Sequence, residues 1–115
     1  MKTILILNGK VINENQILEQ DIFVKDGKIN KIDNDLSSLS ADIVIDASGK
    51  YVMPGMIDDQ VHFREPGNTN KGSIKSEAAA AVVGGVPSFF DMPNNTPPIV
   101  KNSQMDQKFS IAEQS

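Results

Sequence analysis

The stretch PGMIDDQVHFREPG, residues 54–67, marks a change in the character of the chain. Its opening Pro-Gly pair is a turn signal, and residues 56–63 after it predict a strand. An alanine-rich segment, residues 71–83, then predicts a helix, because alanine has the highest helix propensity. Residues 86–92 predict a second strand, and a second helix is expected after a capping Ser103. Strands that alternate with helices are typical of a parallel α/β sheet or barrel.

The first part of the chain predicts short strands joined by turns. Residues 4–7 form an apolar run that Asn8-Gly9 is expected to close as a tight turn. Asp26-Gly27 lies between two further apolar runs and indicates a β-hairpin. Residues 43–45 predict another strand. A parallel α/β barrel needs eight β/α units and about 250 residues, so this chain of 115 residues predicts only the opening of such a domain.

The composition excludes several classes of protein. Apolar residues make up 39% and charged residues 23% of the chain, values that are ordinary for a globular protein. The formal net charge is −4 and no basic run is present, which argues against nucleic acid or an anionic membrane as a partner. The absence of cysteine excludes a disulfide framework and a thiolate metal site in this chain, and we expect a cytoplasmic location.

Polar residues recur at every second position of the predicted strand 56–63. Because side chains alternate between the faces of a strand, Asp58, Gln60 and His62 are expected to share one face. Arg64 follows just beyond the strand and could continue that face. Spacing alone favours an ordinary solvated strand face. His62 is the single histidine of the chain, and a lone histidine is more often structural than a metal ligand.

Two loop residues have side chains that suit ligand binding. Arg64 begins the tight loop Arg64–Gly67, and a guanidinium held there presents a rigid fork that fits a carboxylate. The alternative is a surface ion pair between Arg64 and Glu65. Asn94, in the Pro/Asn-rich loop 93–98, could hydrogen-bond a ligand, but an Asn that only shapes a turn is the more common case.

Two segments taken together resemble the dihydroorotase family. They are PGMIDDQVHFREPG, residues 54–67, and DMPNNTPP, residues 91–98. Allantoinases and dihydropyrimidinases share the PG-x-ID opening but lack the combination of HFREPG with MPN. The resemblance implies an α/β fold in which residues 1–53 are the N-terminal part of a small β-sandwich domain. Residues 54–115 would then be the first two β/α units of a metal-dependent (β/α)8 barrel, which is incomplete in this chain.

The resemblance also implies roles for five residues. The family's first barrel strand carries Asp-x-His-x-His, whose histidines bind a catalytic zinc ion. Asp58 matches the Asp and His62 the second His, whereas Gln60 stands in place of the first His and is a poorer metal ligand. Arg64 and Asn94 match the residues that hold the substrate carboxylate. One or two Zn²⁺ per full-length subunit are therefore expected.

The implied reaction is the reversible hydrolysis of L-dihydroorotate to N-carbamoyl-L-aspartate in pyrimidine biosynthesis. The family's other groups, a carbamylated Lys, two further His and an Asp, come from later strands. No catalytic group is therefore expected within this chain, which by itself should be inactive. The expected partner is a small-molecule substrate, and the full-length parent is expected to be a homo-oligomer.

Three alternatives remain open at this point. The chain could belong to a non-catalytic dihydroorotase-like subunit, for which Gln60 would be the sign of a lost ligand. It could come from another cyclic amidohydrolase, of the allantoinase or dihydropyrimidinase type. A small β-rich binding module is the third alternative.

Overall fold

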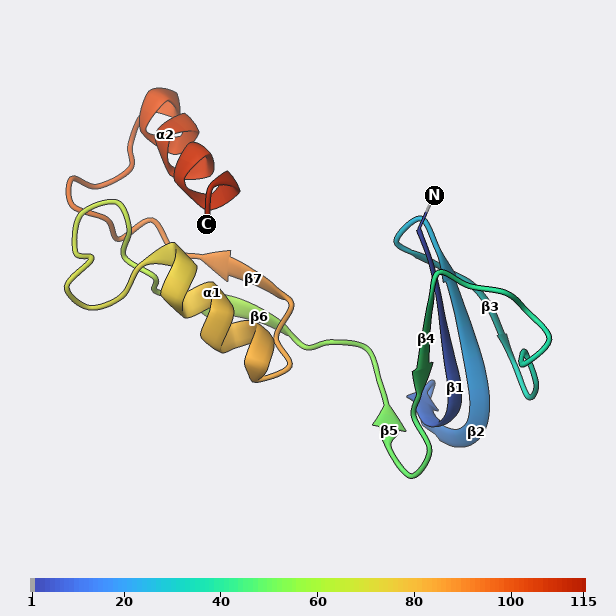
Figure 1. Cartoon of the computed structure of the whole chain (residues 1–115). Helices are drawn as coiled ribbons and strands as arrows, with labels where there is room; N and C mark the ends of the chain where they lie inside the picture. Colours follow the sequence, from blue (N-terminus) through green and yellow to red (C-terminus); the bar gives the residue numbers. More distant parts are fainter. Residues whose placement is uncertain (1) are drawn as a thin grey trace. The chain divides into compact units, whose positions relative to one another are not determined.

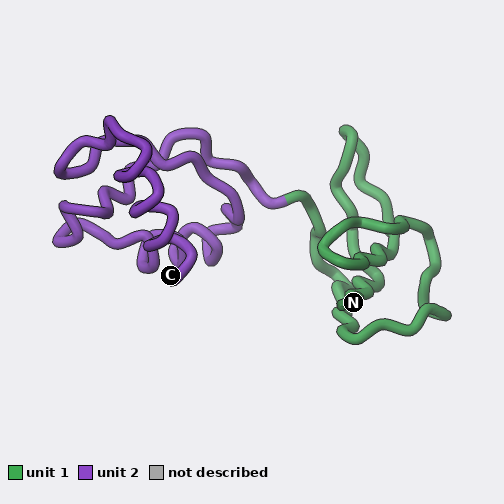
Figure 2. The backbone as a smooth tube through the Cα atoms, turned by 90° about the horizontal axis from the view of Figure 1, so that it is seen from above, with its two compact units in different colours: residues 1–54 green, residues 55–115 purple. Residues whose placement is uncertain are grey.

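The first half of the chain is a sheet built around one long hairpin. In the computed structural model, which describes residues 2–115, this sheet lies in a unit that ends at Pro54, and a second unit begins at Gly55 (Figure 2). The five strands of the first unit are β1 (Thr3–Asn13), β2 (Gln16–Lys25), β3 (Lys28–Asp33), β4 (Ile43–Asp46) and β5 (Tyr51–Val52). Their order is β3-β2-β1-β4, and β5 also pairs with β1 (Figure 1). β4 and β5 run parallel to β1, whereas the other pairs are antiparallel.

Two tight turns connect the antiparallel strands. Asp26 and Gly27 join β2 to β3 with φ angles of 52° and 74°, so the hairpin predicted at Asp-Gly is confirmed. Glu14 and Asn15 join β1 to β2 with φ angles of 49° and 62°. Two successive positive φ angles are typical of the two-residue turns whose twist matches that of the flanking strands.

The tight turn predicted at Asn8-Gly9 is wrong. β1 runs through this dipeptide, and its pairing with β2 shifts register between Ile6 and Gly9, which makes the site a bulge. Asn8 takes a positive φ of 61°, and its N–H donates to Asp21 Oδ1 at 2.8 Å. A Cβ at position 9 would lie 2.7 Å from Val52 Cγ2, so β5 can approach β1 here only because the residue is glycine.

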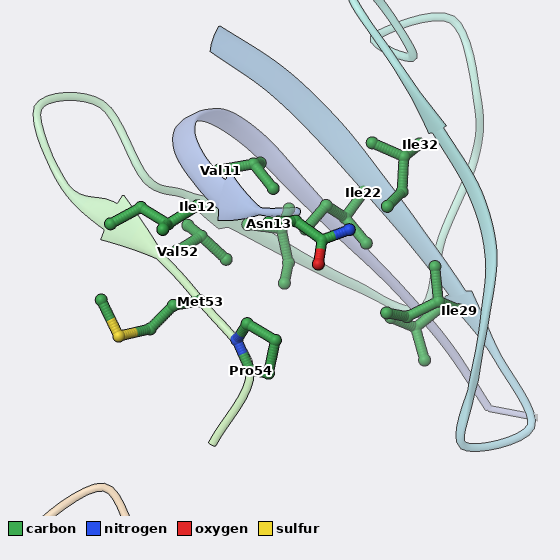
Figure 3. Close-up of a pocket in the computed structure, with 11 residues that line it drawn as sticks. Val11, Ile12, Asn13, Ile22, Ile29, Ile32, Val52, Met53 and Pro54 are labelled. Carbon is green, nitrogen blue, oxygen red and sulfur yellow. The ribbon is translucent and has the colours of Figure 1, made fainter. Parts of the chain in front are cut away.

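The core of the first unit is aliphatic and small. Its buried apolar residues are Leu5, Val11, Ile22, Leu36 and Ala47. A pocket of about 230 Å³ lies against the sheet and is lined by Asn13 and by apolar side chains from β1, β2, β3 and the segment that ends at Pro54 (Figure 3). The first unit therefore leaves part of its apolar sheet face uncovered.

The second unit follows the predicted order of strand, helix, strand and helix. Its elements are β6 (Ile57–Val61), α1 (Ile74–Val83), β7 (Ser88–Asp91) and α2 (Asn102–Glu113). β6 and β7 pair in parallel, with α1 as the connection between them (Figure 1). The core of this unit is small: the rings of Phe63 and Phe89 lie 4.5 Å apart between centroids, and Ile74 at the start of α1 is buried.

Both helices begin at a residue other than the expected one, because their N-terminal caps differ from the predicted caps. α1 begins three residues later than expected, because the Ser73 side chain accepts a hydrogen bond from the Ser76 N–H and caps the helix there. The expected cap of α2 at Ser103 is wrong. Gln104 Oε1 instead accepts hydrogen bonds from the N–H groups of Val100 and Lys101, at 2.9 and 3.0 Å. The Gln104 amide thus reaches back to backbone donors that precede the helix, whereas a Ser103 cap would have accepted from N–H groups after it.

The chain has an α/β fold in which strands predominate over helices. Two parallel strands do not by themselves make a barrel, so the (β/α)8 barrel stays a prediction, as does the assignment of residues 1–53 and 54–115 to two named domains. In residues 2–115 neither helix has both the length and the apolar character that crossing a membrane requires.

Candidate functional site

The polar positions of β6 do not follow a strict alternation. The pairing of β6 with β7 shifts register between Asp58 and Val61, and Asp58 Oδ1 accepts a hydrogen bond from the Gln60 N–H at 3.0 Å. A carboxylate that binds the backbone two residues further on competes with the regular ladder. β6 ends at Val61, so His62 lies beyond the strand. The prediction that Asp58, Gln60 and His62 share one face of a regular strand is therefore wrong.

The structure does bring together His62 and Asn94, which are 32 positions apart in the sequence. His62 follows β6 and Asn94 follows β7, and the carboxyl ends of parallel neighbours meet at the same edge of a sheet. His62 Nδ1 lies 3.1 Å from Asn94 Oδ1. Because an amide oxygen can only accept, this contact requires the proton on Nδ1. It leaves His62 Nε2 and the two N–H donors of the Asn94 amide outside this contact.

Arg64 has an unusual backbone conformation and no acidic partner in residues 2–115. Its φ is 69°, in the left-handed region that non-glycine residues seldom adopt. The alternative ion pair with Glu65 does not form; Glu65 Oε2 instead accepts the N–H of Ile74 at 2.7 Å. Both ion pairs in the described part of the chain join other residues. Arg64 is half-buried as a residue, and no carboxylate of residues 2–115 forms an ion pair with it.

The loops that follow β6 and β7 lie against each other. Thr96 N–H donates to the Pro66 carbonyl at 3.4 Å, and Asn68 Nδ2 donates to Thr96 Oγ1 at 2.9 Å. Gly67 has a φ of 113°, and a Cβ built there would collide with the carbonyl oxygen of Thr96. A glycine is therefore required for the two loops to approach this closely.

Three residues that sequence reasoning missed form a buried contact beside these loops: Asp91, Asn95 and Lys108. Lys108 of α2 places its Nζ 2.6 Å from Asp91 Oδ2 and 3.1 Å from Asn95 Oδ1. Asn95 and Lys108 are both buried, with 4% and 9% of their surfaces exposed. Asp91 and Asn95 flank the MPN motif and could have been noticed for that reason. Lys108 stands in a largely polar helix segment, and nothing in the local sequence distinguishes it.

The residues of this chain do not by themselves fit a zinc ion. Across residues 2–115 no group of three or more His, Cys, Asp or Glu side chains is placed to hold a metal. A catalytic zinc takes three protein ligands, and this chain has one imidazole, that of His62. Gln60 can add only an amide oxygen. The expected zinc therefore stays a prediction about a longer protein.

The resolved pKa shifts all lie away from these loops. The pKa values of Asp33, Asp35, Asp42 and Asp46 fall below the ordinary aspartate value because each carboxylate accepts hydrogen bonds. For Asp42 the donors are the N–H and then the hydroxyl of Thr3, at 2.7 and 2.8 Å. All four belong to the first unit.

Comparison with known proteins places the chain beside enzymes that open cyclic amides. No protein-family model matches it. It is 38% identical over 112 residues to the dihydroorotase of Methanosarcina acetivorans. This alignment covers 97% of this chain and 24% of that protein. It is 46% identical over 101 residues to the dihydroorotase of Aquifex aeolicus, covering 86% of this chain and 24% of that protein. The allantoinase of Escherichia coli is 40% identical over 111 residues, covering 96% and 24%.

Among solved structures, an L-hydantoinase (dihydropyrimidinase) from Arthrobacter aurescens matches 97% of the chain and 25% of its own, with a TM-score of 0.89 and 34% identity. The chain spans about a quarter of the length of the curated relatives that it matches.

Proposed function

We propose that this chain is part of a cyclic amidohydrolase, and specifically of a dihydroorotase, because it is 38% identical over 112 residues to one dihydroorotase and 46% identical over 101 residues to another. The reaction would be the reversible hydrolysis of L-dihydroorotate to N-carbamoyl-L-aspartate. The whole protein would bind this small molecule, and we expect it to be a cytoplasmic homo-oligomer. Residues 1–53 would contribute to a β-sandwich domain, and residues 54–115 would open a (β/α)8 barrel.

The observation that carries this proposal is that two side chains in the loops after β6 and β7, those of Arg64 and Asn94, have N–H donors that are not used in ion pairs with the described residues. Arg64 has no acidic partner in residues 2–115, and the Asn94 amide keeps its N–H donors because its oxygen faces His62. A guanidinium fork and an amide N–H are the groups that suit a carboxylate. Dihydroorotate carries a carboxylate on its ring, whereas hydantoin and allantoin have none, so the donor pair favours dihydroorotate.

If the protein is a dihydroorotase, the residues of this chain would bind and orient the substrate. Arg64 and Asn94 would hold the carboxylate, and the hydrogen bond from His62 to Asn94 Oδ1 would aim the amide N–H groups at it. Zn²⁺, one or two ions per subunit, is proposed for the whole protein, where it would polarise the ring carbonyl. His62 Nε2 is the one imidazole nitrogen that this chain could supply. Gln60 would be a weak ligand, and Asp58 would support the strand end.

A second candidate is an enzyme that acts on a hydantoin or ureide ring. The similarity to the L-hydantoinase structure, with a TM-score of 0.89, and the 40% identity to an allantoinase favour it. A third candidate is a non-catalytic relative, which the loss of an imidazole at Gln60 would suit.

The test is an assay of the purified full-length protein that contains this chain. L-dihydroorotate, N-carbamoyl-L-aspartate, hydantoin and allantoin are offered separately, with Zn²⁺ in the buffer. Turnover of the first two at the highest kcat/KM is expected. Faster turnover of hydantoin or allantoin would overturn the proposal in favour of the second candidate, and no turnover of any substrate would favour the third.

A further inference from the structure

A buried ammonium group lies directly beneath the two loops of the candidate site. Lys108 is the buried residue of α2 and its side chain extends to the end of β7. Its Nζ contacts Asp91 Oδ2 at 2.6 Å and Asn95 Oδ1 at 3.1 Å. A charge removed from water is tolerated only when it is paired and hydrogen-bonded. These two contacts therefore fix where the Lys108 ammonium lies.

The same two partners of Lys108 each bind the backbone of the loop after β6. Asp91 Oδ1 accepts the N–H of Phe63 at 3.0 Å, and Asn95 Nδ2 donates to the Pro66 carbonyl at 3.2 Å. Phe63 stands between His62 and Arg64 in the sequence. One ammonium thus connects the loop that carries Arg64 with the loop that carries Asn94, although α2 contributes neither residue.

The network also determines which way Asn94 faces. Asn95 is 4% exposed, and both polar atoms of its amide are engaged, by Lys108 and by Pro66. Asn94 is its neighbour in the chain and is exposed, with its oxygen against His62. Holding Asn95 inward leaves Asn94 outward, on the side where a substrate carboxylate would bind.

We propose that Lys108 is a positioning residue for carboxylate recognition, which sets the spacing of Arg64 and Asn94 through Asp91 and Asn95. This inference rests on the proposed function, since it assigns the loops to a substrate carboxylate. Lys108 does not touch the substrate. Its effect is on the geometry of groups that do, and a displacement of about 1 Å in such groups can cost about 100-fold in rate.

The test compares Lys108→Met with wild type in the full-length protein. Methionine keeps the length and apolar stem of lysine and removes the charge. The expected result is a fall of about 100-fold in kcat/KM for L-dihydroorotate, mostly as a higher KM. Backbone hydrogen exchange should become faster in residues 62–68 and 92–97 and stay unchanged in β1 and β2. Lys75→Met, at an exposed position of α1, is the control and should match wild type in both measurements.

A second variant separates positioning from stability. Lys108→Met leaves the Asp91 carboxylate buried without its cation, which lowers the thermal midpoint whatever the lysine does for function. When Asp91→Asn is combined with Lys108→Met, the uncompensated charge is gone, while the introduced amide keeps an oxygen for the Phe63 N–H. The thermal midpoint should recover and kcat/KM should stay low, because Asn95 still lacks the ammonium.

Two results would overturn the role of Lys108 alone. One is exchange in residues 62–68 and 92–97 that is unchanged in Lys108→Met. The other is recovery of kcat/KM together with the thermal midpoint in the double variant, which would mean that Lys108 only neutralises Asp91. A wild-type protein that does not turn over dihydroorotate would instead overturn the proposed function, and carboxylate positioning with it.

Discussion

At the scale of single residues, Arg64 combines an uncommon backbone conformation with a side chain that has no acidic partner in residues 2–115. A φ of 69° costs free energy in any residue except glycine, and residues held in such conformations cluster at functional sites. The neighbouring Glu65 accepts a hydrogen bond from the Ile74 N–H and forms no ion pair with Arg64. Both facts favour a ligand-binding role over a surface ion pair.

Arg64→Ala in the full-length protein should therefore damage substrate use much more than folding. Loss of a bidentate contact to a carboxylate should cost about 2–4 kcal/mol in transition-state binding, measured as kcat/KM for dihydroorotate. Arg64→Lys should restore little, since an ammonium lacks the fork. Kinetics equal to wild type in either variant would make Arg64 an ordinary surface residue.

Gln60 gives a prediction about metal content. Its side-chain amide oxygen is a weak zinc ligand, so the site beside His62 should hold zinc poorly. The full-length protein is expected to retain one zinc ion per subunit after exhaustive dialysis. Gln60→His should raise that value towards two, as measured by elemental analysis. Two tightly held ions in the wild type would contradict this prediction.

At the scale of elements, a single carboxylate joins the start of β1 to the residue before β4. Asp42 Oδ2 accepts the N–H and the hydroxyl of Thr3, and the Asp42 N–H donates back to Thr3 Oγ1 at 2.9 Å. These bonds hold the pKa of Asp42 below its usual value, chiefly through the Thr3 N–H. An ionised Asp42 therefore favours the parallel pairing of β1 with β4.

The sign of the pH dependence follows from the lowered pKa. The stabilisation is present above the unfolded-state pKa, 3.8, and is lost as pH falls through that value towards the folded pKa. Asp42→Asn should flatten the acid side of the stability curve, measured as the urea midpoint of the full-length protein between about pH 3 and pH 6. Thr3→Val keeps the backbone donor and should retain most of the pH dependence. If the urea midpoint of Asp42→Asn changes with pH in parallel with that of wild type, the Asp42 carboxylate does not stabilise the contact between β1 and β4.

The sequence predicts an element well when the interactions that form it lie within a few neighbouring residues. Asp26-Gly27 forms the expected hairpin because its turn chemistry is contained in the dipeptide itself. Asn8-Gly9 offers the same chemistry, yet it forms a bulge because Asp21 and β5, both distant in sequence, bind or approach it. Lys108 was missed for a related reason, since its partners Asp91 and Asn95 are 17 and 13 positions away.

At the scale of the whole molecule, the chain leaves much apolar surface uncovered. Ile57 and Phe90 on the paired strands of the second unit are each 63% exposed, and Val83 is 90% exposed. Large exposed apolar patches in a chain of this size favour association. The isolated 115-residue chain is expected to lack a sharp thermal transition as a monomer. A cooperative transition at low concentration, with the monomer mass confirmed by light scattering, would contradict this.

The isolated chain should also show no turnover of dihydroorotate with Zn²⁺ or any other added divalent metal. Its one imidazole, His62, cannot complete the three-ligand set of a catalytic zinc. The measurement is product formation by the purified chain against the full-length protein as the positive control. Metal-dependent turnover by the chain alone would be the contradicting result.

The contact between Asp91 and Lys108 has a consequence for how this sequence can drift during evolution. Removing either partner alone leaves a buried charge and costs about 3–5 kcal/mol, whereas replacing both together can be nearly neutral. A sequence that changes one of the two positions first therefore passes through a less stable protein. Relatives should carry the acid and the base together or neither of them, and the two columns of a family alignment should covary although 17 positions separate them.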